Sequence, residues 1–332
     1  MTSSQPARHV RVLYTGGTIG MLQNANGSLA PATGFEARMG AQWREQALAE
    51  PAWSFQEMQP LIDSANMSPA YWQQLRKAIV AAVDTDGCDA ILVLHGTDTL
   101  AYSAAAMAFQ LVGLPAPVLF TGAMLPAGAP QSDAWENING ALAALAAGQP
   151  AGVQLFFHGE LIAPSRCAKV RSYGRHPFAS LQRNGGAARV ATVPVQLGYR
   201  HPKALAHVGV VALVPGFEPA LLRAMVDSGI QALVLECYGS GTGPSDDTAF
   251  LAALEHARAK DVIVVAITQC HEGGVELGVY EAGSRLREAG VLSGGGMTRE
   301  AAFGKLHGLL GTGLGSDEIR RLIELDLCGE LR

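Results

Sequence analysis

Short apolar runs alternate with longer segments of helical period along most of this chain. In the first half they fall at 10–14, 68–83, 90–94, 99–111, 117–121, 134–147 and 153–157. Apolar runs of strand length that alternate with helix-length segments are typical of βαβ units. The pattern therefore predicts an α/β fold, with a parallel sheet covered by helices on both faces.

The regular pattern lapses between residues 181 and 206, where Asn184-Gly185-Gly186 and scattered prolines show no helical period. It then resumes at 208–214, 219–227, 232–236, 247–259 and 262–268, and it closes with a predicted amphipathic helix over 316–327. We therefore predict an N-terminal α/β domain over 1–183, a linker over 184–206 and a smaller C-terminal α/β domain over 207–332.

The amino-acid composition argues against nucleic acid and membranes as binding partners of this protein. The chain has 332 residues, of which 48% are hydrophobic and 16% charged, so it can bury a large core. Its net charge of −5 and its lack of a Lys/Arg run argue against nucleic acid. Residues 99–132 contain no charged residue, but Gly113, Pro115 and Pro117 interrupt them. We therefore expect buried elements there and no membrane span.

The five cysteines are widely scattered and contain no C-x-x-C pair. This spacing favours reduced thiols over a disulfide framework or a zinc site. Residues 1–12 lack the apolar core that a secretory signal needs. We therefore expect a cytoplasmic protein.

Two short segments share a threonine-glycine pattern. Residues 14–20 read Y-T-G-G-T-I-G and residues 95–99 read H-G-T-D-T, and each places a threonine beside glycine directly after a strand-like run. Ligands of open parallel sheets bind outside the carboxyl ends of the strands. We therefore expect Thr15 and Thr97 to face one small substrate. Taken singly, the Thr15 segment also suits a structural turn, and in the second segment Thr97 or Asp98 suits a helix N-cap.

A threonine hydroxyl becomes a useful nucleophile only when a base accepts its proton. Thr97 and Asp98 place a hydroxyl and a carboxylate on one turn, and Lys169 is a candidate base. Such a base must be neutral, which for lysine requires a pKa well below its ordinary value of about 10.4. The competing interpretation of Lys169 is a solvated surface lysine.

These segments resemble a known family. Residues 15–20 (T-G-G-T-I-G) and 95–102 (H-G-T-D-T-L-A-Y) are similar to the two signature segments of bacterial L-asparaginases. Residues 63–67, 262–270 and 305–307 resemble the cytoplasmic type I group most. The resemblance implies a flavodoxin-like N-terminal domain and hydrolysis of the asparagine side-chain amide, without metal or organic cofactor.

Carried over by position, the resemblance implies that Thr15 is the primary nucleophile. Thr97, Asp98 and Lys169 would form a second set of hydroxyl, carboxylate and amine. Asp98 would also bind the α-ammonium group of the substrate, and the backbone N–H of Thr97 is an expected oxyanion donor.

The resemblance also implies a substrate-binding set around these groups. Ser64, flanked by Asp63, would bind the α-carboxylate, Ala123 would contact the amide through its main chain, and Gly16 would shape the loop after Thr15. The active protein would be a homodimer or homotetramer, with each site at a junction between subunits.

Three positions depart from the family pattern. Relatives carry a tyrosine on the loop after the first threonine, whereas Ser28 is the nearest positional match here. Asn66 stands where aspartate is expected, and Thr242 stands where asparagine is common.

Other functions stay open at this point. Glutamine hydrolysis or ammonia supply in a tRNA-dependent amidotransferase would use the same site. A non-catalytic amino-acid-binding protein is a different class, made conceivable by the missing tyrosine. Phosphate or dinucleotide binding is disfavoured, because neither glycine turn matches a nucleotide-binding motif.

Overall fold

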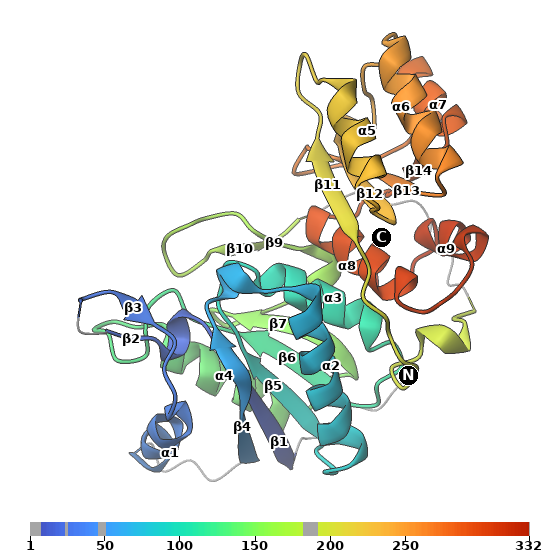
Figure 1. Ribbon diagram of the computed structural model, residues 1–332. Helices are drawn as coiled ribbons and strands as arrows, with labels where there is room; N and C mark the ends of the chain where they lie inside the picture. Colours follow the sequence, from blue (N-terminus) through green and yellow to red (C-terminus); the bar gives the residue numbers. More distant parts are fainter. Residues whose placement is uncertain (1–7, 24–25, 46–50, 182–191, 332) are drawn as a thin grey trace. The chain divides into compact units, whose positions relative to one another are not determined.

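The computed structural model describes residues 8–23, 26–45, 51–181 and 192–331 (Figure 1). The chain forms two compact α/β units, which confirms the predicted fold class. Unit 1 comprises Met1–Pro164 and Lys169–Ala179, and unit 2 comprises Ser165–Ala168 and Ser180–Arg332. Residues 184–191 of the predicted linker lie outside the described residues. Residues 192–206 contain a single 3-10 turn, Val195–Leu197.

The first 180 residues supply ten strands and four helices to the described part of the chain. The strands are β1 (His9–Gly16), β2 (Leu22–Gln23), β3 (Leu29–Ala30), β4 (Ala52–Ile62), β5 (Ala90–Leu94), β6 (Pro117–Thr121), β7 (Gly152–Phe157), β8 (Glu160–Ile162), β9 (Cys167–Lys169) and β10 (Phe178–Ser180). The helices are α1 (Phe35–Glu45), α2 (Pro69–Asp84), α3 (Leu100–Gln110) and α4 (Ala134–Ala146).

The main sheet of unit 1 has the order β4-β1-β5-β6-β7-β8, and only β8 runs antiparallel to its neighbour. Val12 and Leu92 point to one face, where they pack with Phe35 of α1 and Ile138 of α4. Helices α2 and α3 cover the other face (Figure 1). Because successive side chains of a strand point to opposite faces, the uniformly apolar strands serve both layers.

The two longest elements of unit 1 that were not predicted are β4 and α1; the short strands β2, β3, β8, β9 and β10 were not predicted either. Strand β4 is an edge strand that pairs only with β1 in the described sheet, and most of its residues are half-buried or exposed. Its mixed sequence therefore lacks the continuous apolar run of the central strands. Helix α1 buries only Phe35 and Met39, so its apolar stripe is too narrow to stand out in the sequence.

Unit 2 contains a second parallel sheet with helices on both faces. Its elements are β11 (Val208–Ala212), β12 (Ala232–Cys237), β13 (Ile263–Thr268), β14 (Leu292–Ser293), α5 (Pro219–Asp227), α6 (Thr248–Ala259), α7 (Glu281–Glu288), α8 (Arg299–Leu310) and α9 (Ser316–Ile323). The strand order is β11-β12-β13-β14. Leu235 faces a core shared with α5, α6 and α7, whereas Val234 faces a core shared with α8 and α9.

Two helix ends can be compared with the ends that the sequence predicts, the start of α2 and the end of α9. Helix α2 begins at the start of the predicted 68–83 segment, with Ser68 as N-cap and Pro69 in the first turn. Helix α9 ends at Ile323, four residues earlier than predicted. The ammonium group of Lys305 donates to the carbonyl oxygens of Ile323 and Leu325, at 2.8 and 2.6 Å, and so satisfies oxygens at the point where the helix stops.

Candidate active site

Thr15 is the second-last residue of β1, and His95 to Asp98 follow the neighbouring strand β5. Tyr14 pairs with Leu94 across these strands, so both threonine-glycine turns leave the same edge of the sheet. The Thr15 hydroxyl is buried and donates a hydrogen bond of 3.1 Å to the carbonyl oxygen of Leu94. Neither Thr97 nor Asp98 is the N-cap of α3, because that position belongs to Thr99.

The backbone at Thr15 departs from regular pairing. The register of β1 against β4 jumps from Tyr14↔Glu57 to Gly16↔Ile62. The Tyr71 hydroxyl of α2 fills this irregularity, lying 3.0 Å from the carbonyl oxygen of Pro60 and 3.4 Å from that of Thr15. Burial raises the pKa of Tyr71 well above its ordinary value, so the phenol remains a donor. The sequence carried no local signal for this contact, which spans two separate elements.

Glycines let three loops approach one another at this edge. A Cβ atom on Gly17 would lie 2.3 Å from the Cα atom of Gly96, and one on Gly96 would lie 2.5 Å from the Ser64 hydroxyl oxygen. A Cβ atom on Gly16 would lie 2.3 Å from the carbonyl oxygen of Ile62. Side chains would therefore force these loops apart, which is why glycine is needed at these positions.

Lys169, Thr97 and Asp98 form one hydrogen-bonded group. The Lys169 ammonium donates to the Thr97 hydroxyl oxygen at 2.9 Å and to the Asp98 carboxylate at 2.6 Å. The Lys169 side chain is 18% exposed and that of Asp98 is 63% exposed. Lys169 is therefore not a free surface lysine. A lysine in direct contact with a hydroxyl can exchange a proton with it once the amine is neutral.

Asp63 and Ser64 open a short 3-10 turn, Ser64–Asn66, that lies against the turn after β5. The Asp63 carboxylate caps this turn by accepting from the backbone N–H of Ala65 at 3.1 Å. Thr99 donates through its hydroxyl to the Ser64 carbonyl oxygen at 2.8 Å. The structure thus brings Ser64, which is buried, beside the Gly96–Thr97 segment.

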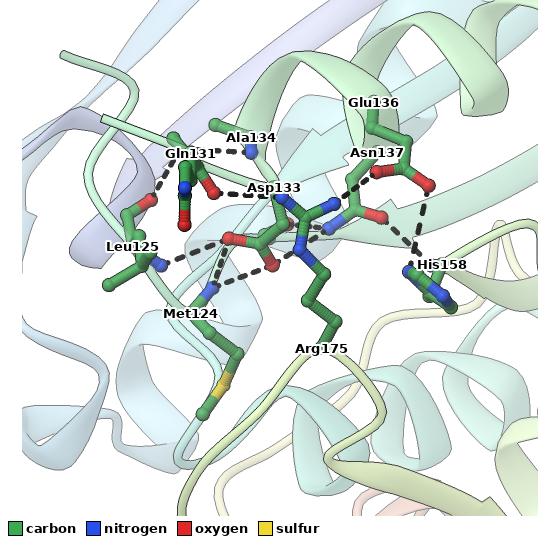
Figure 2. Close-up of polar contacts among 11 residues, drawn as sticks. Met124, Leu125, Gln131, Asp133, Ala134, Glu136, Asn137, His158 and Arg175 are labelled. Carbon is green, nitrogen blue, oxygen red and sulfur yellow. Dashed lines mark hydrogen bonds and ion pairs between the residues drawn. The ribbon is translucent and has the colours of Figure 1, made fainter. Parts of the chain in front are cut away.

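Ala123 is fully buried in the turn that follows β6. Side chains at the start of α4 hold this turn in place (Figure 2). The backbone N–H groups of Met124 and Leu125 donate to the Asp133 carboxylate, and Asn137 donates to the carbonyl oxygen of Gly122. Asp133 and Asn137 were not among the predicted site residues, because neither belongs to a recognisable catalytic pattern in the sequence.

The His95 side chain points into the protein rather than toward solvent. It is fully buried, and its Nδ1 donates to the carbonyl oxygen of Gly96 at 2.7 Å. Burial lowers the pKa of His95 to about 4, although the bond to Gly96 acts in the opposite direction. The imidazole is therefore neutral near pH 7 and is a poor proton acceptor.

The positions that depart from the family pattern lie at separate places. Ser28 precedes β3, and its hydroxyl donates to the side-chain oxygen of Asn26 at 2.7 Å. Asn66 is exposed at the end of the 3-10 turn after Asp63. Thr242 lies in unit 2, where its hydroxyl donates to the carbonyl oxygen of Tyr238 at 3.3 Å.

The described residues show two further features that bear on function. Across the described ranges, His, Cys, Asp and Glu side chains do not gather in groups of three that could hold a metal ion. Every helix in those ranges is too short or too polar to span a bilayer.

Comparison with known proteins gives a consistent result. Residues 9–202 match the family model described as "Asparaginase, N-terminal", and residues 207–323 match "Glutaminase/Asparaginase C-terminal domain". The chain is 37% identical to L-asparaginase 1 of Escherichia coli, with 98% of each chain covered. It is 34% identical to the human 60 kDa lysophospholipase, with 98% of this chain and 62% of that protein covered.

A solved structure agrees with these sequence matches. L-asparaginase I from Vibrio cholerae superposes with a TM-score of 0.84 and 33% identity, covering 98% of this chain and 99% of that chain. The family models together span most of the chain and both α/β units. This chain therefore belongs to the asparaginase family and is an enzyme of the amidohydrolase class.

Proposed function

We propose that this enzyme hydrolyses the side-chain amide of L-asparagine to L-aspartate and ammonia through an acyl-enzyme on Thr15. The observation that carries the proposal is the hydrogen-bonded group of Thr97, Asp98 and Lys169, one strand away from Thr15. This arrangement supplies two hydroxyls, a carboxylate and an amine at one sheet edge, which are the groups that acyl transfer needs.

In the first half of the reaction, the Thr15 hydroxyl oxygen attacks the amide carbon. The hydroxyl must first leave the carbonyl oxygen of Leu94, to which it donates in this structure. The proton released from Thr15 passes toward the leaving nitrogen, the C–N bond breaks, and ammonia departs. The backbone N–H of Thr97 stabilises the oxyanion; removal of one such donor typically costs about 3–4 kcal/mol of transition-state stabilisation.

In the second half, water hydrolyses the ester on Thr15. Lys169 is the proposed acceptor of the proton from water, acting through Thr97, because the two side chains are already in hydrogen-bond contact at 2.9 Å. The attacking oxygen of water forms the new carboxyl group, the C–O bond to Thr15 breaks, and Thr15 recovers its proton. Aspartate is the product.

Substrate recognition follows from charge. The largely exposed Asp98 carboxylate is available to the α-ammonium group of an amino acid, and Ser64 supplies a neutral donor for the α-carboxylate. Gly16 and Asp63 shape the loops that carry Thr15 and Ser64. The main chain at Ala123 contacts the side-chain amide.

The experiment is a steady-state comparison of ammonia release from asparagine and glutamine by the wild type, Thr15→Val and Thr97→Val. Valine keeps the shape of threonine and removes its hydroxyl. We expect release from asparagine and near-complete loss in both variants, with unchanged circular dichroism. Full turnover by either folded variant would refute the acyl-enzyme assignment.

Glutamine hydrolysis is the second candidate, favoured by the "Glutaminase/Asparaginase" description of the C-terminal match. It uses the same groups on a substrate with one more methylene. A kcat/KM for glutamine that exceeds that for asparagine would select it. Saturable binding of asparagine without ammonia release would select the amino-acid-binding alternative instead.

We further propose a cytoplasmic homodimer or homotetramer with sites at subunit junctions. The support is the family resemblance, which implies that the loop after β12 reaches a neighbouring subunit. In this chain that loop is a bridged turn of Tyr238 and Thr242 at the carboxyl end of the sheet in unit 2. Light scattering coupled to gel filtration measures the assembly. A monomer with full activity would exclude the junction.

A further inference from the structure

The turn after β6 has no strand or helix partner for two of its backbone N–H groups. Those of Met124 and Leu125 both donate to the carboxylate of Asp133, at distances of 2.9 to 3.0 Å. Asp133 is only 2% exposed. A buried carboxylate is costly unless hydrogen bonds compensate for lost water, and the N–H groups of this turn supply them. The charge and the turn therefore stabilise each other.

Asn137 lies beside Asp133, four residues further along the chain, and holds the Gly122 end of the same turn (Figure 2). Its amide nitrogen donates to the Gly122 carbonyl oxygen at 3.0 Å and to Asp133 at 3.3 Å. Its amide oxygen accepts from the backbone N–H of His158 at 2.8 Å. Asn137 is fully buried, and both of its N–H groups are used.

The position of Asp133 at the start of α4 makes its contacts with the turn unusual. Asp133 is the N-cap residue of α4, yet its side chain makes no capping bond to that helix. Aspartate at an N-cap ordinarily accepts from the second or third N–H of its own helix. Here the oxygens face the turn after β6 instead. The hydroxyl of Ser132 accepts from the first N–H group of the helix, that of Ala134, at 3.1 Å, and the Asp133 carboxylate serves the turn.

We propose that Asp133 and Asn137 are positioning residues that fix the Gly122–Leu125 turn, so that the main chain at Ala123 meets the amide being hydrolysed. The inference rests on the proposed amidohydrolase function. Neither side chain touches the substrate in this account. Each acts through the backbone, whose placement decides how well the leaving amide is oriented for attack.

The test compares two carboxylate-to-amide changes at the start of one helix, at its N-cap and in its first turn. Asp133→Asn removes one acceptor from the turn. Glu136→Gln is the matched control, because its carboxylate contacts Arg175 and His158 and is 50% exposed. Asn137→Asp is a second variant that keeps the size of the side chain and removes its donors to Gly122. Ammonia release from asparagine gives kcat and KM, and thermal unfolding gives Tm.

We expect Asp133→Asn and Asn137→Asp to lower kcat by about 10- to 100-fold with little change in KM, because misplacing a reacting group by about 1 Å costs up to about 100-fold. Glu136→Gln should keep the wild-type kcat. An Asp133→Asn enzyme with the kcat of Glu136→Gln would overturn the proposal, as would a rise in KM alone. Failure of both variants to fold would assign them a purely structural role and also overturn it.

This outcome is separable from failure of the proposed function. A wild type that releases no ammonia from asparagine, or an active Thr15→Val variant, contradicts the function. An active wild type, an inactive Thr15→Val variant and an unaffected Asp133→Asn variant contradict the positioning role alone.

Discussion

The ammonium nitrogen of Lys169 lies 2.9 Å from the hydroxyl oxygen of Thr97, although 72 residues separate them in the chain. The same nitrogen lies 2.6 Å from the Asp98 carboxylate. A base must reach the proton that it removes at about 2.6–3.2 Å, and this pair satisfies that condition without rearrangement. The contact therefore links the second threonine to a candidate base, and it can be tested directly.

The first prediction distinguishes two roles of Lys169, that of a proton acceptor and that of a positive charge. Lys169→Met removes both, whereas Lys169→Arg keeps a cation that cannot give up its proton. If Lys169 is a base, both variants should lose about 10²- to 10⁴-fold in kcat. Steady-state ammonia release measures this, with Lys77→Met on the exposed side of α2 as control. An arginine variant within a few-fold of wild type would leave only an electrostatic role.

The second prediction concerns the contact between Gly17 and Gly96. Gly17 and Gly113 have nearly equal positive φ angles of 79° and 80°, but only Gly17 would place a Cβ atom against another backbone, 2.3 Å from Gly96. Gly113→Ala should cost about 1–2 kcal/mol from the backbone conformation alone. Gly17→Ala should cost about 1–3 kcal/mol more through overpacking, and it should lower turnover. Urea unfolding and ammonia release check both effects; equal costs would contradict the close approach.

The third prediction is a loss of stability in acid through His95. Its pKa is about 4 in the folded chain and 6.5 ordinarily, so between these values the unfolded chain binds a proton that the folded chain excludes. Stability from this group is therefore complete above pH 6.5 and falls as the pH drops toward 4, by at most about 1.4 kcal/mol per pH unit.

The measurement is urea unfolding of the wild type and His95→Gln between pH 4 and 7.5. The glutamine variant lacks the titrating group, so the stability advantage of the wild type should narrow as the pH falls. His271→Gln, at an exposed position, is the control and should give a constant difference. A constant difference for His95→Gln would contradict the burial effect.

The fourth prediction concerns the buried ion pair of Lys305 and Glu330. Both side chains are 0% exposed and lie 2.7 Å apart. Burial lowers the pKa of Lys305, and the Glu330 charge acts to raise it. Lys305→Met leaves the Glu330 carboxylate buried without its cation, which should cost about 3–5 kcal/mol.

A double-mutant cycle isolates the pair. Glu330→Gln added to Lys305→Met removes the unpaired charge while keeping an acceptor for the N–H groups of Leu327 and Cys328. The double variant should therefore be destabilised by less than the sum of the single changes. The exposed pair of Arg321 and Glu318 should show a coupling below about 1 kcal/mol in the same experiment. Additive costs at Lys305 and Glu330 would refute the coupling.

The sequence by itself determined the α/β class, the central strands and the two threonine-glycine turns. These features are set by local hydrophobic period and by residues next to one another, so Thr15 and Thr97 could be placed at strand ends before any contact was known. The same reasoning did not predict β4 or α1. Strand β4 is an edge strand that pairs with β1, and α1 buries only two side chains, so neither has a clear hydrophobic period.

The tertiary structure alone decided which distant groups meet. Lys169 joins Thr97 and Asp98 across 72 and 71 residues, Tyr71 reaches the backbone of Thr15, and Asp133 faces the turn after β6 rather than its own helix. Family resemblance suggested the first of these, and nothing in the sequence suggested the other two. Such contacts depend on how separate elements pack, and neighbouring residues in the chain do not encode them.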